Sequence, residues 1–322
     1  MFNLEPNPQT VDCNAPQASR IVQTCDTFFM LPLNCWTLAA RSRITGILTD
    51  VDDTLTTDGA ITPDALAALG QLQARGIQVI AITGRPVGWS EPFAMAWPVA
   101  AVVAENGAVL LRKSSKYDLQ PNEDGGNQLL KSYQQSHQAR LANFARMQQI
   151  SQRVLLEVPG ALLAQDSGWR ETDMAIDHSE FTQLPPEKIA QVVAIMQSEG
   201  MNATVSSIHI NGWFGAHNKL TGACWAVREL FGRDLLLEIC NWAFVGDSTN
   251  DQLMFEAFAN SVGVANVQRF AAQLAHLPRY ITDGTRGAGF AEVSRAVLTA
   301  QENQANRCSP SQLVDTHDTP LG

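Results

Sequence analysis

Residues 46–54 read GILTDVDDT, an apolar run followed by a cluster of aspartates. A short apolar run bounded by polar residues predicts a buried strand, so Asp50 and Asp52 would lie at its carboxyl end. Two carboxylates this close along the chain repel each other, and a bound divalent cation compensates that repulsion. The stretch therefore predicts an acidic ligand site at the end of a strand, with an acidic turn as the plain structural alternative.

Strand-like and helix-like segments alternate after this stretch. The patterns predict helices at 62–76 and 89–95 and strands at 78–82 and 100–104. Farther along the chain they predict helices at 220–231 and 251–257 and strands at 242–245, 261–264 and 280–282. Alternation at this spacing predicts an α/β fold whose core is a Rossmann-like, doubly wound parallel sheet.

The alternation stops between about residues 112 and 216. The patterns there predict helices at 128–151 and 185–200 and strands at 161–165, 174–176 and 203–210. We interpret 112–216 as an inserted α/β cap that carries substrate specificity, and 44–111 together with 217–300 as the catalytic core. Residues 1–43 would be an N-terminal extension, or a mis-assigned start if Met30 begins the protein, and the polar residues 301–322 would be a disordered tail.

The composition is that of a globular protein with a negative charge. With 322 residues, 45% of them hydrophobic, the chain is long enough for about two domains at roughly 150 residues each. Its net charge of -10 argues against nucleic acid or an anionic membrane as the partner. The six cysteines include no CxxC pair, and we interpret them as free thiols of a cytoplasmic protein.

Three further signals accompany the aspartate cluster. Residues 246–251, GDSTND, follow a predicted strand and supply hard oxygen ligands that suit Mg²⁺, although Asp251 also suits a helix N-cap. Residues 83–85, TGR, end another strand and form a turn able to bind an anion. Lys219 is the only lysine beyond residue 188, which makes it a candidate phosphate ligand, whereas most lysines are solvated surface residues.

In their order along the chain, these four motifs resemble the haloacid dehalogenase (HAD) superfamily of aspartate-nucleophile phosphatases. The resemblance runs from about residue 44 to residue 293. The insert, preceded by the sequence ENGA at 105–108, resembles the cap of the Cof-like (type IIB) subgroup, which includes relatives of sucrose-phosphate and trehalose-phosphate phosphatases. Asp53 and Leu220 depart from the pattern, because glycine is common at both positions in Cof-like members.

The resemblance implies a role for each motif residue. Asp50 would be the nucleophile that forms an aspartyl-phosphate, and Asp52 the general acid and base. Thr83 and Lys219 would hold the phosphoryl oxygens. The Mg²⁺ site would comprise Asp50, Asp52 through its backbone carbonyl, Asp247 and Asp251. Substrate contacts are expected from Thr54, Gly84, Arg85, Asn106, Arg170 and His209; for the cap residues among them, a place in the core or at the rim is the alternative.

The expected activity is that of a Mg²⁺-dependent phosphomonoesterase acting on a small, sugar-like phosphate. An acid at position 52 favours phosphatase or phosphomutase chemistry, since dehalogenase members lack it and transport ATPases carry threonine there. A hexose-phosphate phosphomutase is the alternative and would need extra cap cations such as Arg170 or Lys188. A receiver-like phosphorylation switch is a third hypothesis, but the length of the chain and the large insert argue against it. The sequence leaves the substrate and the oligomeric state open.

Overall fold

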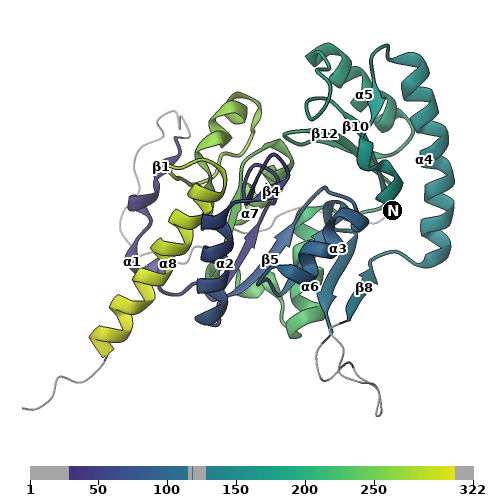
Figure 1. The fold of residues 1–322 in the computed structure, drawn as a ribbon. Coiled ribbons are helices and arrows are strands. Elements are labelled where there is room, and N and C mark those ends of the chain that lie inside the picture. Colours follow the sequence, from purple (N-terminus) through teal and green to yellow (C-terminus); the bar gives the residue numbers. More distant parts are fainter. Residues whose placement is uncertain (1–28, 115–117, 119–127, 309–322) are drawn as a thin grey trace, which may run out of the picture.

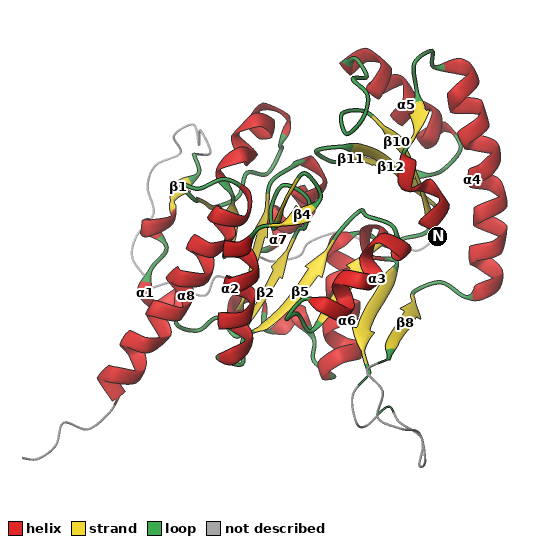
Figure 2. Ribbon diagram, viewed as in Figure 1, coloured by secondary structure: helices red, strands yellow, loops and turns green. Residues whose placement is uncertain are grey.

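The computed structural model describes residues 29–114, 118 and 128–308. Within these residues, nine strands form one large sheet (Figure 2). In spatial order they are β1 (Leu31–Pro32), β15 (Tyr280–Ile281), β14 (Ser261–Gly263), β13 (Trp242–Gly246), β2 (Gly46–Thr49), β5 (Gln78–Ile82), β6 (Ala101–Ala104), β7 (Val109–Lys113) and β8 (Leu129–Tyr133). The strands from β1 to β6 pair in parallel, and β7 and β8 add an antiparallel edge. Strands β3 (Thr56–Thr57) and β4 (Ala60–Ile61) form a separate two-stranded antiparallel sheet.

Helices cover both faces of this sheet. One face carries α1 (Leu38–Arg41), α2 (Pro63–Ala74), α3 (Val87–Ala96) and α8 (Arg286–Cys308), and the other carries α6 (Lys219–Phe231) and α7 (Gln252–Ala257). Strand β2 shows why the sequence reads as a continuous apolar run: Ile47 packs into one layer and Leu48 into the other. The expected α/β fold with a Rossmann-like sheet is confirmed.

A second, smaller sheet lies at the end of the main sheet toward which the arrow of β5 points (Figure 1). Its antiparallel strands, in spatial order, are β11 (Asn202–Val205), β12 (His209–Trp213), β10 (Asp173–Asp177) and β9 (Leu162–Leu163). Helices α4 (His137–Glu157) and α5 (Pro186–Ser198) cover it and share a separate apolar core that includes Val154, Ile176 and Val192. From here on, the cap means residues 137–213.

Some expected elements were wrong. The helix expected at 128–151 is strand β8 followed by α4, which begins after Ser136, whose side chain accepts a hydrogen bond from the Ala139 amide. Because β8 pairs with β7, residues 112–113 and 129–133 lie in the main sheet and not in the cap sheet. The strand expected at 203–210 is the hairpin of β11 and β12. The tail expected from residue 301 is helical as far as Cys308, and the rest of it lies outside the described residues.

The described part of the expected N-terminal extension is built into the core. Strand β1 pairs in parallel with β15. The Trp36 side chain is fully buried, donates from Nε1 to Asn260 Oδ1 at 3.0 Å, and stacks on Tyr280 with a centroid distance of 5.7 Å. Residues 1–28 lie outside the described part of the chain. Residues 29–43 therefore belong structurally to the main sheet and its helices.

Two observations concern the cysteines and a possible membrane span. Cys35 and Cys224 are free thiols, as expected, but the expectation is wrong for Cys240, which takes part in a disulfide bond. Among the described residues, no helix combines the length and the apolar character needed to cross a bilayer.

Replacement of Trp36 by alanine tests the role of this N-terminal segment. We expect Trp36→Ala to lower the free energy of unfolding by about 3–5 kcal/mol, because a large buried aromatic side chain and its hydrogen bond to Asn260 are lost. Urea denaturation followed by fluorescence or circular dichroism measures the change. Leu237→Ala, at a side chain that is 88% exposed, is the control and should change stability by less than about 0.5 kcal/mol. Equal stability of the two variants would show that residues 29–43 are dispensable.

Candidate active site

The predicted motif residues meet at one edge of the main sheet. Strands β13, β2 and β5 are parallel neighbours in register, so the residues after them lie side by side. Asp247, Asp50 and Thr83 are those residues, and all three side chains are buried. The carboxyl edge of a parallel sheet is where ligands bind in open α/β folds, and the structure brings the motifs together there.

Lys219 reaches this edge because of how α6 begins. The Asn218 side chain accepts from the Thr221 amide and the Thr221 hydroxyl accepts from the Asn218 amide, both at 2.9 Å, which forms a capping box. The start of α6 also packs against the turn after β6, where a Cβ on Gly222 would lie 2.5 Å from the Gly107 Cα. Only glycine permits that approach, and it places Lys219 at the centre of the site.

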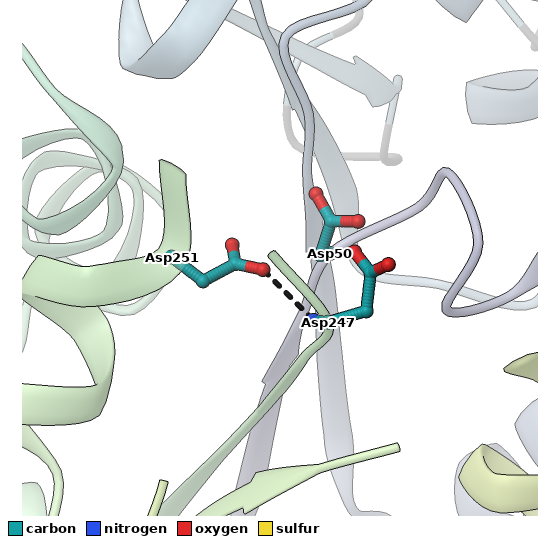
Figure 3. A group of neighbouring side chains, drawn as sticks. All are labelled: Asp50, Asp247 and Asp251. Carbon is teal, nitrogen blue, oxygen red and sulfur yellow. Dashed lines mark hydrogen bonds between the residues drawn. The ribbon is translucent and has the colours of Figure 1, made fainter. Parts of the chain in front are cut away.

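Asp50, Asp247 and Asp251 form a buried acidic triad (Figure 3). One carboxylate oxygen of each lies within 4.8 Å of the others. The Lys219 ammonium donates to Asp50 Oδ1 at 2.5 Å and to Asp251 Oδ1 at 2.7 Å. Lys219 is thus shared by two of the three carboxylates, while Asp247 Oδ2 lies 3.5 Å from Nη2 of the half-exposed Arg269. Burial, opposed by Lys219 and reinforced by Asp251 and Asp52, raises the pKa of Asp50 to about 8; burial and the Asp50 charge raise the pKa of Asp247 well above its usual range.

The donors of the triad suit a divalent cation. Asp247 Oδ1 is buried and has no hydrogen-bond partner among the described residues, while Oδ2 accepts from Asn266 Nδ2 at 2.8 Å. Hard oxygen atoms without histidine or cysteine suit Mg²⁺. Both carboxylate oxygens of Asp251 already accept hydrogen bonds: Oδ1 from Lys219, and Oδ2 from the Asp247 and Ser248 amides. Asp50 and Asp247 are therefore the side chains best placed to bind the ion, and Asp251 orients Lys219 and the loop.

The Asp52 carboxylate lies outside the triad and is bound by Arg85. Arg85 Nε donates to both Asp52 oxygens at 3.0 and 3.1 Å, and its Nη2 donates to Glu180 Oε1 of the cap at 2.7 Å. The other Glu180 oxygen lies 2.8 Å from His209 Nε2. Burial alone would raise the pKa of Glu180, but the His209 hydrogen bond and the Arg85 charge outweigh it and lower that pKa to about 2. Glu180 was not predicted, since a lone glutamate in a loop gives no local signal.

Arg170 joins the cap to the core. Its buried guanidinium donates to the Asp166 carboxylate, to Asp173 Oδ1 at 2.8 Å and to the Gly84 carbonyl at 3.0 Å. Asn106 Nδ2 lies 3.4 Å from Asp173 Oδ2, beside the same contact. The predicted substrate-binding residues Gly84, Arg170 and Asn106 are thus brought together: Arg170 binds the Gly84 carbonyl, and Arg170 and Asn106 both bind Asp173.

Glu105 is a second residue that the sequence patterns did not single out for a role. Its fully buried carboxylate accepts from the Val87 amide of α3 and, in the cap, from the Glu171 amide, both at 3.0 Å, and from the Thr172 amide at 2.6 Å. Burial raises its pKa. Because Glu105 bonds to both sides, it links the start of α3, just after Arg85, to the cap.

The space directly over the nucleophile candidate is narrow. Asp50, Asp52 and Arg85 line it from the core, and residues 206–209 of the β11–β12 hairpin line it from the cap. Its volume is about 10 Å³, roughly the room of one water molecule. Two of the predicted site residues do not line this space. The Thr83 Oγ1 accepts a hydrogen bond from the Arg85 amide at 2.9 Å, and the Thr54 side chain is fully buried.

The sequence and the fold match known proteins. Residues 47–149 match the family model for haloacid dehalogenase-like hydrolases, which confirms the resemblance seen in the motifs of this part of the chain and supports an enzyme of the hydrolase type. Asp50, Asp52 and Thr83 lie inside the matched range, whereas Lys219 and Asp247 lie outside it. No curated protein matches the sequence.

Solved structures with the same fold cover most of the chain at low identity. A Thermoplasma acidophilum protein is 16% identical with a TM-score of 0.57, over 79% of this chain and 98% of its own. A HAD/Cof-like hydrolase from Plasmodium vivax is 16% identical with a TM-score of 0.58, over 82% and 99%. The sucrose-phosphatase from Synechocystis, solved with sucrose and phosphate, is 15% identical with a TM-score of 0.54, over 78% and 97%.

The acidic triad predicts a stability that depends on pH and metal. Because the folded protein raises the pKa of Asp50 to about 8 and also that of Asp247, it binds their protons more tightly than the unfolded chain does. Without metal, the free energy of unfolding should therefore fall as the pH rises from about 4 to about 8. Asp247→Asn removes one of the charges and should flatten this dependence. Urea denaturation across that pH range in a chelator measures both slopes.

Millimolar Mg²⁺ should restore the stability of the wild type near pH 8 and have little effect on Asp247→Asn, because the ion binds the deprotonated carboxylates. Identical slopes for the two proteins, with and without Mg²⁺, would contradict the assignment of Asp247 to the charge cluster.

Proposed function

We propose that the protein is a Mg²⁺-dependent phosphomonoesterase that hydrolyses a small, sugar-like phosphate through an aspartyl-phosphate. The observation that carries this proposal is the Lys219 ammonium held between Asp50 and Asp251, beside Asp247, at the carboxyl edge of the sheet. That arrangement offers a carboxylate nucleophile together with the positive charge that a phosphoryl group requires. The hydrolase family match supports it, as does the fold shared with a sucrose-phosphatase.

The chain's own side chains account for the steps of such a reaction. Asp50 would attack phosphorus in line, forming an Oδ–P bond as the bond to the leaving alkoxide breaks. Asp52 would give its proton to that alkoxide and then remove one from the water that hydrolyses the aspartyl-phosphate. Lys219 and the turn at Thr83 would hold the phosphoryl oxygens. Mg²⁺, bound by Asp50 and Asp247 together with the Asp52 carbonyl, would neutralise the charge on the phosphoryl group.

Arg85 would position Asp52 for this role. The two Nε hydrogen bonds fix the Asp52 carboxylate at the wall of the cavity beside Asp50. The phosphomutase alternative needs free cations in the cap, and Arg170, one of those considered, is bound by two carboxylates. Hydrolysis is therefore the proposal that the site favours. The cytoplasmic location expected from the cysteine pattern stays a prediction.

Loss of the nucleophile should abolish the activity. We expect the wild type to release phosphate from p-nitrophenyl phosphate and from sugar phosphates in the presence of Mg²⁺, and Asp50→Asn to lower kcat at least about a thousandfold. Phosphate release measures the effect. Asp58→Asn, in the exposed turn between β3 and β4, is the matched control and should keep full activity. An Asp50→Asn variant that keeps its activity would contradict the proposal. Conversion of a hexose 1-phosphate to the 6-phosphate without phosphate release would favour the phosphomutase instead.

The effect on kcat of removing the proton donor should depend on the leaving group. Asp52→Asn should lower kcat by about 10²–10⁴ for a sugar phosphate, whose alkoxide needs a proton. The loss should be smaller for p-nitrophenyl phosphate, because nitrophenolate leaves without one. Parallel steady-state assays on the two substrates give the ratio. A loss of the same size on both would argue that Asp52 serves only to hold Arg85 or the metal.

A further inference from the structure

A second group of charged side chains adjoins the acidic triad and centres on Asp53. This residue follows Asp52 in the loop after β2 and has a φ of 56°, in the left-handed region. Its Oδ1 lies 2.9 Å from Nε of Arg286, the first residue of α8. Its Oδ2 accepts a hydrogen bond at 3.1 Å from Nη2 of Arg269, in the 3-10 helix η7 (Ala265–Gln273). The Asp53 carboxylate is therefore held between two guanidinium groups.

Arg269 lies between Asp53 and the carboxylate of Asp247, one of the two side chains best placed to bind the metal ion. Its Nη2 is 3.1 Å from Asp53 Oδ2 and 3.5 Å from Asp247 Oδ2, so the contact with Asp53 is the shorter of the two. Asn266 Nδ2 donates to the Asp53 carbonyl at 3.0 Å and to Asp247 Oδ2 at 2.8 Å. One guanidinium nitrogen and one amide group thus connect the loop after β2 to Asp247.

Arg269 is the member of this group that is free to change position. The Asp247 side chain is fully buried and that of Asp53 is 15% exposed, whereas that of Arg269 is 49% exposed. A half-exposed arginine samples other rotamers rapidly, so its position depends on the partner that holds it. Without Asp53, its remaining carboxylate contact would be Asp247. An arginine at Asp247 and a divalent cation would then compete for the same negative charge.

We propose that Asp53 is a positioning residue of the metal site, which holds the Arg269 guanidinium away from Asp247 so that Mg²⁺ neutralises that carboxylate. The inference rests on the Mg²⁺ site of the proposed function and goes beyond it, because it assigns a role to residues that neither react nor bind the ion. Asp247 Oδ1 has no hydrogen-bond partner among the described residues, and Oδ2 already accepts from Asn266. Arg286, at the other Asp53 oxygen, keeps Asp53 in place.

The proposal predicts opposite effects for the two partners of one ion pair. The dissociation constant of Mg²⁺ is measured by isothermal titration calorimetry with MgCl₂ at pH 8 and low ionic strength, because salt screens a half-exposed charge. We expect Asp53→Asn to raise Kd about tenfold, since Arg269 is released toward Asp247. Arg269→Gln removes the competing charge and should lower Kd at least about threefold. The double variant should return to within about threefold of the wild type.

Two further variants control for the backbone and for the loss of a charge elsewhere. Asp53→Gly suits the φ of 56° and should raise Kd as much as Asp53→Asn does. Asp58→Asn removes a carboxylate from an exposed residue that also has a positive φ, 51°, and should leave Kd unchanged. Urea denaturation in a chelator shows whether each variant is folded before the titration.

The signs of these changes separate the proposed role from a purely structural one. An ion pair that only stabilised the loop would weaken Mg²⁺ binding whichever partner was removed. A higher Kd for both single variants, without recovery in the double variant, would therefore overturn the proposal. An Asp53→Asn variant with the Kd of the wild type would overturn it too, while leaving the phosphatase intact. A wild type that binds no Mg²⁺ at tens of millimolar would overturn the metal site of the proposed function as well.

Discussion

The buried ammonium of Lys219 is the interaction on which the rest of the site depends. Asp50, Asp247 and Asp251 converge with their side chains almost fully buried, and a buried charge without a counter-charge costs several kcal/mol. Lys219 neutralises part of this charge and leaves a net negative site. Burial, reinforced by the charges of Asp251 and Asp52, raises the pKa of Asp50, and the residual charge suits the divalent cation that we infer. The helix cap and the glycine contact that begin α6 serve to put this one side chain in place.

Charged hydrogen bonds connect the cap to the core. Glu105, Arg170 and the Arg85–Glu180 pair connect the two units through charged hydrogen bonds. Hydrogen bonds between charged groups contribute about 1.5–3 kcal/mol each, so these contacts stabilise the position of the cap over the carboxyl edge of the main sheet.

Local signals in the sequence were sufficient to predict which residues meet at the carboxyl edge of the main sheet. Asp50, Thr83 and Asp247 each follow an apolar strand, and parallel pairing brings the ends of such strands together whatever lies between them. Strand β8 was mistaken for helix because its residues show no clear period of two, and only its pairing with β7 distinguishes it. Glu105 and Glu180 were missed as functional residues because their partners lie far away in the sequence, in contacts that no local pattern encodes.

The sequence by itself determined the class of fold and the set of reacting groups, because strand periodicity and the residues at strand ends are local properties. The tertiary structure alone decided two things: that Arg85 binds Asp52 and that Asp251 orients Lys219. Each is a relation between side chains brought together from distant segments. The distances and burial that set their charge and hydrogen bonding arise only when the core and the cap have packed.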